Sequence, residues 1–266
     1  MAEMPYVLKI AEIKQENNET KTFYFNHDID YKPGQFVMLW LPDIDEKPFS
    51  LSYHKKGVFG ITVERRGGYT QALHKLKAGD RLGVRGPYGK GFTIIKDGAC
   101  VVAGGCGAAA IMPLIDTLNK PTLIIGFRSK EKIIFSEKID SLPQTEICTD
   151  DGSIGFKGFA TERFKEILKT KKFEVVYTCG PEQMMKNVFD LCQLHNIYCE
   201  ASLERFMVCA IGICGQCACN HIRICVEGPV LGTENLSKLS DFGAYAMLKT
   251  GKKVPLNDYY SYRTVY

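Results

Sequence analysis

Four cysteines in the last quarter of the chain, Cys209, Cys214, Cys217 and Cys225, have a spacing that suits iron–sulfur chemistry. The first three follow the pattern C-x4-C-x2-C, which is common among the ligands of [2Fe–2S] clusters. The fourth lies in the segment CACNHIRIC, where a tight hairpin could bring it back to the others. Glycines and alanines between them let the backbone wrap closely and direct N–H groups at sulfur. The pattern predicts a centre that carries one electron at a time.

Other interpretations of these thiols are a zinc site, a disulfide pair and buried cysteines without a ligand. Zinc sites usually have two C-x2-C-like pairs separated by a longer span, so zinc stays open only as an alternative. Disulfides are not expected, because the N-terminal sequence resembles no signal peptide and a cytoplasmic chain keeps its 11 cysteines reduced unless they bind metal. Cys219 is a further candidate ligand, but its C-x-C relation to Cys217 favours Cys225 instead.

A glycine-rich segment at 101–114 is a second candidate site. It contains Gly105 and Gly107 in the form G-x-G-x-x-A, between an expected strand and an expected helix. In that context backbone N–H groups can bind a pyrophosphate, although such a turn can also serve packing alone. The acidic residue that usually follows the second strand is replaced by Arg128. An acid would bind a ribose 2′-hydroxyl and an arginine could accept a 2′-phosphate, so NADH and NADPH both stay open.

Cys179 and Gly180 end another expected strand of the same region. The carboxyl ends of parallel strands are where ligands bind in such sheets. The Cys179 thiol could therefore contact a nicotinamide ring, or it could be a small buried apolar side chain, which is the commoner role of a cysteine.

The elements that must position these residues divide the chain into three parts. Residues 1–97 contain short alternating runs separated by glycine and proline turns, which predicts a small antiparallel β-barrel. Residues 98–201 alternate apolar strands with helices, which predicts a parallel sheet covered on both faces. Residues 202–266 are rich in cysteine and then polar. Five strands are expected in the central part, at 99–105, 121–127, 145–150, 173–180 and 197–201.

The composition is that of an ordinary globular protein. The chain has 266 residues, 45% of them hydrophobic, and a formal net charge of +4 without long basic runs, which argues against nucleic-acid binding. No run approaches the length of a membrane span, so a cytoplasmic location is expected. The tyrosine-rich end at 258–266 could dock on a partner or fray.

Several motifs in the order of the chain are similar to those of the ferredoxin-reductase superfamily, and most of all to the electron-transfer subunits of class B dihydroorotate dehydrogenases. They run through most of the chain, and the last two are the most specific. The motifs are KPFSLS (47–52), GGYT (67–70), GPYGKGF (86–92), VAGGCGAAAIMPL (102–114), GFRSK (126–130), TDDGSIGFKGFAT (149–161), CGPEQMM (179–185), and ERFMVCAIGICGQCAC with RICVEGPVL (204–231).

This resemblance implies a flavin- and iron–sulfur-dependent oxidoreductase subunit. The barrel would hold FAD, the sheet a nicotinamide nucleotide, NAD(P), and the C-terminal part the [2Fe–2S] cluster. Ser50 would lie near flavin N5 and the residue at 47 would face the FAD phosphates. Pro48 and Phe49 complete this flavin motif. The remaining residues that the resemblance places at FAD are Thr62, Val63 and Glu64 along the isoalloxazine, and Tyr69 and Thr70 near the pyrophosphate.

One departure from the family concerns Lys47, where the family usually has arginine. Lysine offers a point charge in place of a bidentate fork, so FAD would be held more weakly or by other groups. The resemblance further implies a partner, an FMN-containing dihydroorotate dehydrogenase subunit in a heterotetramer that serves pyrimidine biosynthesis. Two alternatives remain, the small subunit of an NADPH–ferredoxin or sulfide-dehydrogenase-type oxidoreductase and a zinc-binding interaction module on a reductase scaffold.

Overall fold

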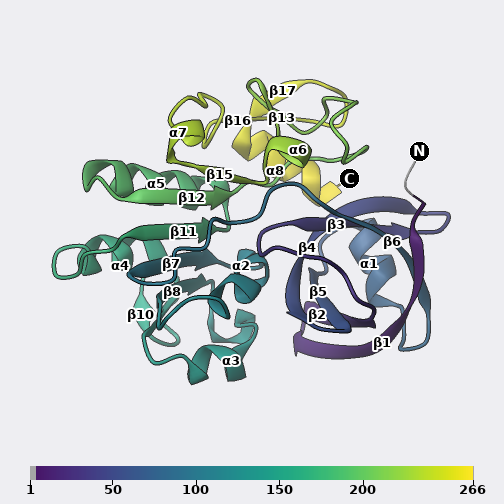
Figure 1. Cartoon of the computed structure of the whole chain (residues 1–266), viewed down its shortest axis with the longest axis horizontal. Helices are drawn as coiled ribbons and strands as arrows, with labels where there is room; N and C mark the ends of the chain where they lie inside the picture. Colours follow the sequence, from purple (N-terminus) through teal and green to yellow (C-terminus); the bar gives the residue numbers. More distant parts are fainter. Residues whose placement is uncertain (1–3, 266) are drawn as a thin grey trace.

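A computed structural model describes residues 4–265, and Figure 1 shows its three parts. A barrel lies beside an α/β sheet, and the C-terminal segment, drawn in yellow, packs across the top of both. No helix among the described residues is long and apolar enough to cross a membrane.

The N-terminal part is a closed barrel of six strands, as the sequence predicts. Alternate residues of its strands point inward, and Phe23, Phe25, Leu39 and Ile61 are fully buried in its core. The short helix α1 (Gly68–His74) packs on the barrel through Leu73. The strand order is β1-β2-β5-β4-β3-β6, with bounds β1 (Tyr6–Asn17), β2 (Thr20–Asn26), β3 (Phe36–Leu41), β4 (Asp45–Lys55), β5 (Val58–Glu64) and β6 (Arg81–Tyr88).

The central part is a sheet in which all five expected strands are present and parallel. The short strand β10 adds to one edge in parallel, and β15 adds to the other edge antiparallel to β12. The order is β10-β9-β8-β7-β11-β12-β15, with bounds β7 (Ala99–Gly104), β8 (Thr122–Phe127), β9 (Thr145–Thr149), β10 (Phe156–Lys157), β11 (Val175–Cys179), β12 (Tyr198–Ser202) and β15 (Val230–Gly232).

Helices cover both faces of this sheet, because successive strand residues point to opposite sides and both sets are apolar. On one face α2 (Gly107–Ile115) and α3 (Ser136–Ser141) pack on residues such as Val101. On the other face α4 (Ala160–Ile167) and α5 (Glu182–Leu194) pack on residues such as Val102. The 3-10 turn η1 (Lys130–Lys132) follows β8.

The strand order reverses between β7 and β11. Helices leave neighbouring strands in opposite directions at such a point, which opens a crevice at the carboxyl ends of the strands. The glycine-rich loop follows β7 and Cys179 ends β11, so both sequence-predicted nucleotide motifs lie at this point.

The C-terminal part is not a separate body. Its strand β15 joins the central sheet, and the expected boundary near 201 falls inside β12, so the division into 1–97, 98–201 and 202–266 stays a proposal. Residues 258–265 of the tyrosine-rich end belong to α8 (Leu256–Val265), and residue 266 lies outside the described residues. Tyr259 of this helix is 1% exposed and packs on Phe206. The other elements here are β13 (Ala218–Cys219), β14 (Ile222–Arg223), α6 (Ile224–Glu227), α7 (Thr233–Leu236), β16 (Tyr245–Met247), β17 (Lys253–Pro255) and α8 (Leu256–Val265).

Candidate functional site

The four predicted cluster cysteines lie as two pairs. Cys209 and Cys214 are within hydrogen-bonding contact of each other, and so are Cys217 and Cys225. Among residues 4–265, no three histidine, cysteine or acidic side chains gather tightly enough to hold a single metal ion. Two neighbouring pairs of thiols suit a two-iron cluster, which takes four thiolates in all.

Backbone N–H groups are already directed at the sulfur atoms. Ile213 and Cys214 donate to Cys209 Sγ at 3.4 and 3.5 Å, and Cys225 donates to Cys217 Sγ at 3.4 Å. Burial acts to raise the pKa of the Cys209 thiol, but the N–H groups around it outweigh burial and lower its pKa to about 6. A thiol with a low pKa is readily available as the thiolate that binds iron.

Cys219, the alternative ligand, is turned away from these pairs. Its Sγ accepts a hydrogen bond of 3.3 Å from Arg205 Nη2, and Arg205 is paired with Glu182 of α5. Burial raises the pKa of the Cys219 thiol. The geometry thus supports Cys225 as the fourth ligand and gives Cys219 a place beside a buried ion pair.

The proposed flavin motif lies on β4. Lys47 pairs with Leu39 of β3, and Ser50 pairs with Phe36 and is half-buried. The ring of Phe49 stacks on that of Tyr69, with centroids 6.1 Å apart. Helix α2, which follows the glycine loop, packs against the same strand. The barrel motif and the nucleotide motif are therefore neighbours.

Other residues that the resemblance places at FAD have their side chains engaged within the barrel. Thr62 Oγ1 donates to Ser52 Oγ at 2.7 Å, and Val63 is 1% exposed in the core. The Tyr69 hydroxyl donates to the Leu39 carbonyl at 2.7 Å, and Thr70 Oγ1 accepts from Gly67 N at 3.1 Å. Contacts of these four residues with a flavin are therefore expected to involve the main chain.

The glycines of the nucleotide motif allow a close approach between two loops. A Cβ at Gly107 would lie 2.5 Å from the Cys179 carbonyl oxygen and 2.6 Å from Gly180 Cα. Gly105 has φ +53°, and its own Cβ position faces open space. Packing therefore explains Gly107, while Gly105 leaves room beside the loop for a ligand.

Residues from all three parts of the chain border this crevice. The main chain of Glu64 hydrogen-bonds to Cys106, and Glu204 acts electrostatically on both Cys106 and Cys179. Burial raises the pKa of Cys179 to about 12, so its thiol stays protonated. Cys179 is therefore suited to pack against a ring and unsuited to act as a base at neutral pH.

Arg128 directly follows β8, which ends at Phe127, and is exposed. The neighbouring Lys132 forms an ion pair with Glu19 of the barrel at 2.5 Å. Arg128 acts electrostatically on Glu19 as well, so both basic residues face the β1–β2 turn. The place of Arg128 therefore does not distinguish NADH from NADPH.

Arg85 of β6, which no sequence pattern marks, joins the barrel to the loop of residues 209–225, the cysteine loop. Two of its nitrogens bind the Glu46 carboxylate at 2.6 Å, and Nη1 donates to the Cys209 carbonyl at 3.3 Å. Nη1 also donates to the Tyr88 hydroxyl at 3.2 Å. Nothing in the local sequence could reveal this link, because Arg85 and Cys209 are 124 residues apart.

Replacing Arg85 by methionine is expected to loosen the cysteine loop while the barrel stays folded. Methionine keeps the apolar bulk but removes every hydrogen bond, including the one to the carbonyl of Cys209, an expected cluster ligand. We expect iron to be lost several times faster to a chelator, measured by the decay of visible absorbance. Replacing the exposed Arg81 on the same strand should leave that rate unchanged, and equal rates for both variants would contradict the role of Arg85.

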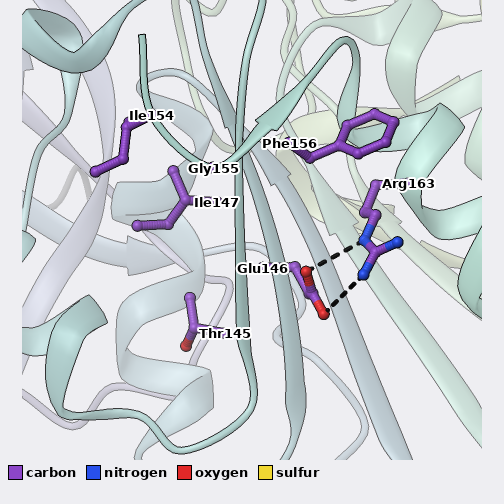
Figure 2. Close-up of a pocket in the computed structure, with 7 residues that line it drawn as sticks. All are labelled: Thr145, Glu146, Ile147, Ile154, Gly155, Phe156 and Arg163. Carbon is purple, nitrogen blue, oxygen red and sulfur yellow. Dashed lines mark hydrogen bonds and ion pairs between the residues drawn. The ribbon is translucent and has the colours of Figure 1, made fainter. Parts of the chain in front are cut away.

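One surface hollow lies at the edge of the sheet, partly on the motif at 149–161 (Figure 2). It is bordered by β9, β10 and α4, where Arg163 binds both oxygens of Glu146 at 3.2 Å. None of the sequence-predicted site residues borders it. We therefore assign the function to the crevice and the cysteine loop.

Comparison with known families agrees with this geometry. Residues 7–92 match the oxidoreductase FAD-binding domain, and residues 204–237 match the iron-sulfur cluster binding domain of dihydroorotate dehydrogenase B. The second match spans all four cysteines and names iron–sulfur, not zinc. A solved NADH-dependent reduced ferredoxin-NADP oxidoreductase is 27% identical, with a TM-score of 0.79, over 86% of this chain and 89% of that one.

Two curated relatives are similar over almost their whole length. A protein of Methanocaldococcus jannaschii is 46% identical over 95% of this chain and 99% of its own. One of Methanothermobacter thermautotrophicus is 38% identical over 95% and 98%. Both are named probable dihydroorotate dehydrogenase B (NAD(+)), electron transfer subunit. Together with the barrel, the crevice and the paired cysteines, these similarities establish that the chain belongs to the family of dihydroorotate dehydrogenase B electron transfer subunits.

Proposed function

We propose that this chain carries electrons between NAD+ and an FMN-containing dihydroorotate dehydrogenase subunit, through FAD in the barrel and a [2Fe–2S] cluster in the cysteine loop. The observation that carries the proposal is the meeting of three parts around one crevice, with Arg85 tying the barrel to the carbonyl of Cys209. Both curated relatives carry NAD(+) in their names, which supports NAD+ over NADP+.

The order of the sites follows from chemistry. When bound, FAD can exchange a hydride with a nicotinamide and single electrons with a cluster, so it belongs between the two. The chain's part is to orient these groups: Ser50 lies on β4 of the barrel, Cys179 ends β11 of the sheet, and the thiols of the cysteine loop would hold the irons.

The surface around the cysteine loop supports docking of a partner subunit. Val208, Ile211, Ile213 and Val226 are 59%, 51%, 80% and 39% exposed, and Cys214 between them is exposed as well. Exposed apolar side chains that gather in one place often mark protein interfaces. A partner that covers this apolar patch would bring its own redox group close to the cluster.

We also propose a cytoplasmic location, because 11 free cysteines suit a reducing compartment. The alternative of a small subunit in an NADPH–ferredoxin-type enzyme has one supporting observation, the 27% identity to the solved ferredoxin-NADP oxidoreductase chain. The 46% identity to a named dihydroorotate dehydrogenase B subunit favours the first function.

Reconstitution tests this proposal directly. The isolated chain should reduce an artificial dye with NADH but should not oxidise dihydroorotate. Adding the FMN-containing subunit should produce NADH from dihydroorotate and NAD+, and gel filtration should show a complex. Replacing Ile213 by aspartate should abolish the complex and leave dye reduction intact, since a charge on the apolar patch would be buried without a partner.

Two results would contradict the proposal. The first is oxidation of dihydroorotate by the isolated chain. The second is a strong preference for NADPH in dye reduction, together with no complex formation, which would favour the ferredoxin-type alternative. Replacing Leu194, an apolar residue 78% exposed but far along α5 from the cysteine loop, by aspartate is the matched control for the patch.

A further inference from the structure

Two lysines from distant parts of the chain share one carboxylate on the barrel. Lys47 of the flavin motif contacts Asp45, and Lys249 Nζ lies 3.6 Å from the same Asp45 Oδ2. The two ammonium groups are also close enough to affect each other directly. One carboxylate thus faces two ammonium groups. Asp45, Lys47 and Lys249 together carry one excess positive charge.

Lys249 is held in place by the cysteine loop. It sits in the turn between β16 and β17, where Leu248 N donates to the Lys252 carbonyl at 2.9 Å. Gln216, which lies between two of the cluster cysteines, donates to the Leu248 carbonyl at 2.7 Å. Lys249 Nζ also lies 5.9 Å from the ring centre of Phe206. These contacts fix the turn against the cysteine loop and Phe206, and the ion pair with Asp45 joins it to the barrel.

The position is the one where the FAD phosphates are expected. Lys47 pairs with Leu39, whose carbonyl binds the Tyr69 hydroxyl, and Tyr69 stacks on Phe49 of the flavin motif. Asp45 acts electrostatically on Tyr69 as well. The two lysines therefore lie beside the 67–70 segment. Lysine at 47 has a single ammonium where arginine would offer two parallel N–H donors. A second cation would therefore supply the second charged hydrogen bond to the phosphates.

We propose that Lys249, from the C-terminal segment, binds the diphosphate of FAD together with Lys47. This inference rests on the proposed function, which places FAD in the barrel. Burial lowers the pKa of Lys47, and the neighbouring Lys249 lowers it too, while Asp45 raises it. A diphosphate would add the negative charge that the pair of lysines lacks. In this arrangement the segment that holds the cluster also closes over the flavin.

A simpler role for the same contacts is a strap that ties the C-terminal segment to the barrel. The two roles predict opposite effects for Asp45. If Lys249 and Asp45 form only a strap, removing either partner weakens the same contact and both variants change in the same direction. If the lysines bind phosphate, Asp45 competes with the ligand for them, and removing its charge should strengthen binding.

The test is the dissociation constant of FAD, measured by recovery of flavin fluorescence on dilution of the purified holoprotein. Lys249→Gln should raise this constant about tenfold, because a charged hydrogen bond is lost. Lys249→Arg should stay near the wild type. Asp45→Asn, which keeps an oxygen to accept the Glu46 N–H, should lower the constant. Riboflavin, which has no phosphate, should bind the wild type and Lys249→Gln equally.

Lys252→Gln, an exposed lysine of the same turn, is the matched control and should leave the constant unchanged. An unchanged constant for Lys249→Gln, or weaker FAD binding by both Lys249→Gln and Asp45→Asn, would overturn the inference in favour of the strap. A wild-type protein that binds no FAD at all would instead overturn the proposed function, so the two failures are distinct.

Discussion

Replacing Cys217 by serine is expected to abolish the iron–sulfur absorbance while FAD stays bound. Cys217 is 2% exposed and contacts Cys225, and its Sγ accepts the Cys225 N–H at 3.4 Å. Serine provides a hard hydroxyl that is rarely ionised, so one iron would lose a thiolate ligand. Iron and acid-labile sulfide should fall to background in anaerobically purified protein, and dye reduction with NADH should be largely retained, because none of the residues expected at the flavin or the nicotinamide is changed.

Cys225→Ser and Cys219→Ser complete the experiment. Cys225→Ser should lose the cluster to the same extent, since it completes the same pair of thiols. Cys219→Ser should keep it, because that thiol contacts Arg205. Equal loss of iron from Cys219→Ser and Cys217→Ser, with the cluster retained in Cys225→Ser, would show that Cys219 is the fourth ligand.

Local sequence patterns predicted the parts of this molecule whose residues are near one another in the chain. The alternation in 1–97, the five buried strands and the cysteine spacing are all of this kind, because each strand or loop is determined mainly by its own residues. The glycine loop was found for the same reason. Its Gly107 proves to serve packing against Cys179, which spacing alone cannot distinguish from ligand binding.

Contacts between the parts could not be predicted from the same patterns. Strand β15 returns to the sheet after the cysteine loop, and α8 buries Tyr259 where the sequence left docking on a partner and fraying both open. Arg85 and Lys249 had no signal, because an isolated basic residue is usually a surface charge. Arg205 and Glu182 stood within the motifs ERFMV and CGPEQ, but only the fold brings them together.

Breaking the ion pair of Arg205 and Glu182 is expected to be the most destabilising single change outside the cysteines. The side chains are 1% and 4% exposed, and Arg205 Nη2 donates to Glu182 Oε1 at 2.8 Å. Glu182 Oε1 also accepts the Gly243 N–H at 3.0 Å. The pair therefore joins the start of α5 in the central sheet to the C-terminal segment that carries the cluster.

Arg205→Met should lower the free energy of unfolding by about 3–5 kcal/mol, because the Glu182 carboxylate would remain buried without its partner. Urea unfolding measures this loss. The double variant Arg205→Met with Glu182→Met should recover most of it, since two apolar side chains of similar length leave no buried charge. The free energy of unfolding of Arg205→Lys should lie between those of the wild type and Arg205→Met. An ammonium keeps the positive charge, but it cannot contact Glu182, Cys219 and the Tyr245 carbonyl together as the guanidinium does. If the double variant were as unstable as Arg205→Met, the loss would come from packing around the arginine, and the ion pair would not be what holds the cluster segment to the sheet.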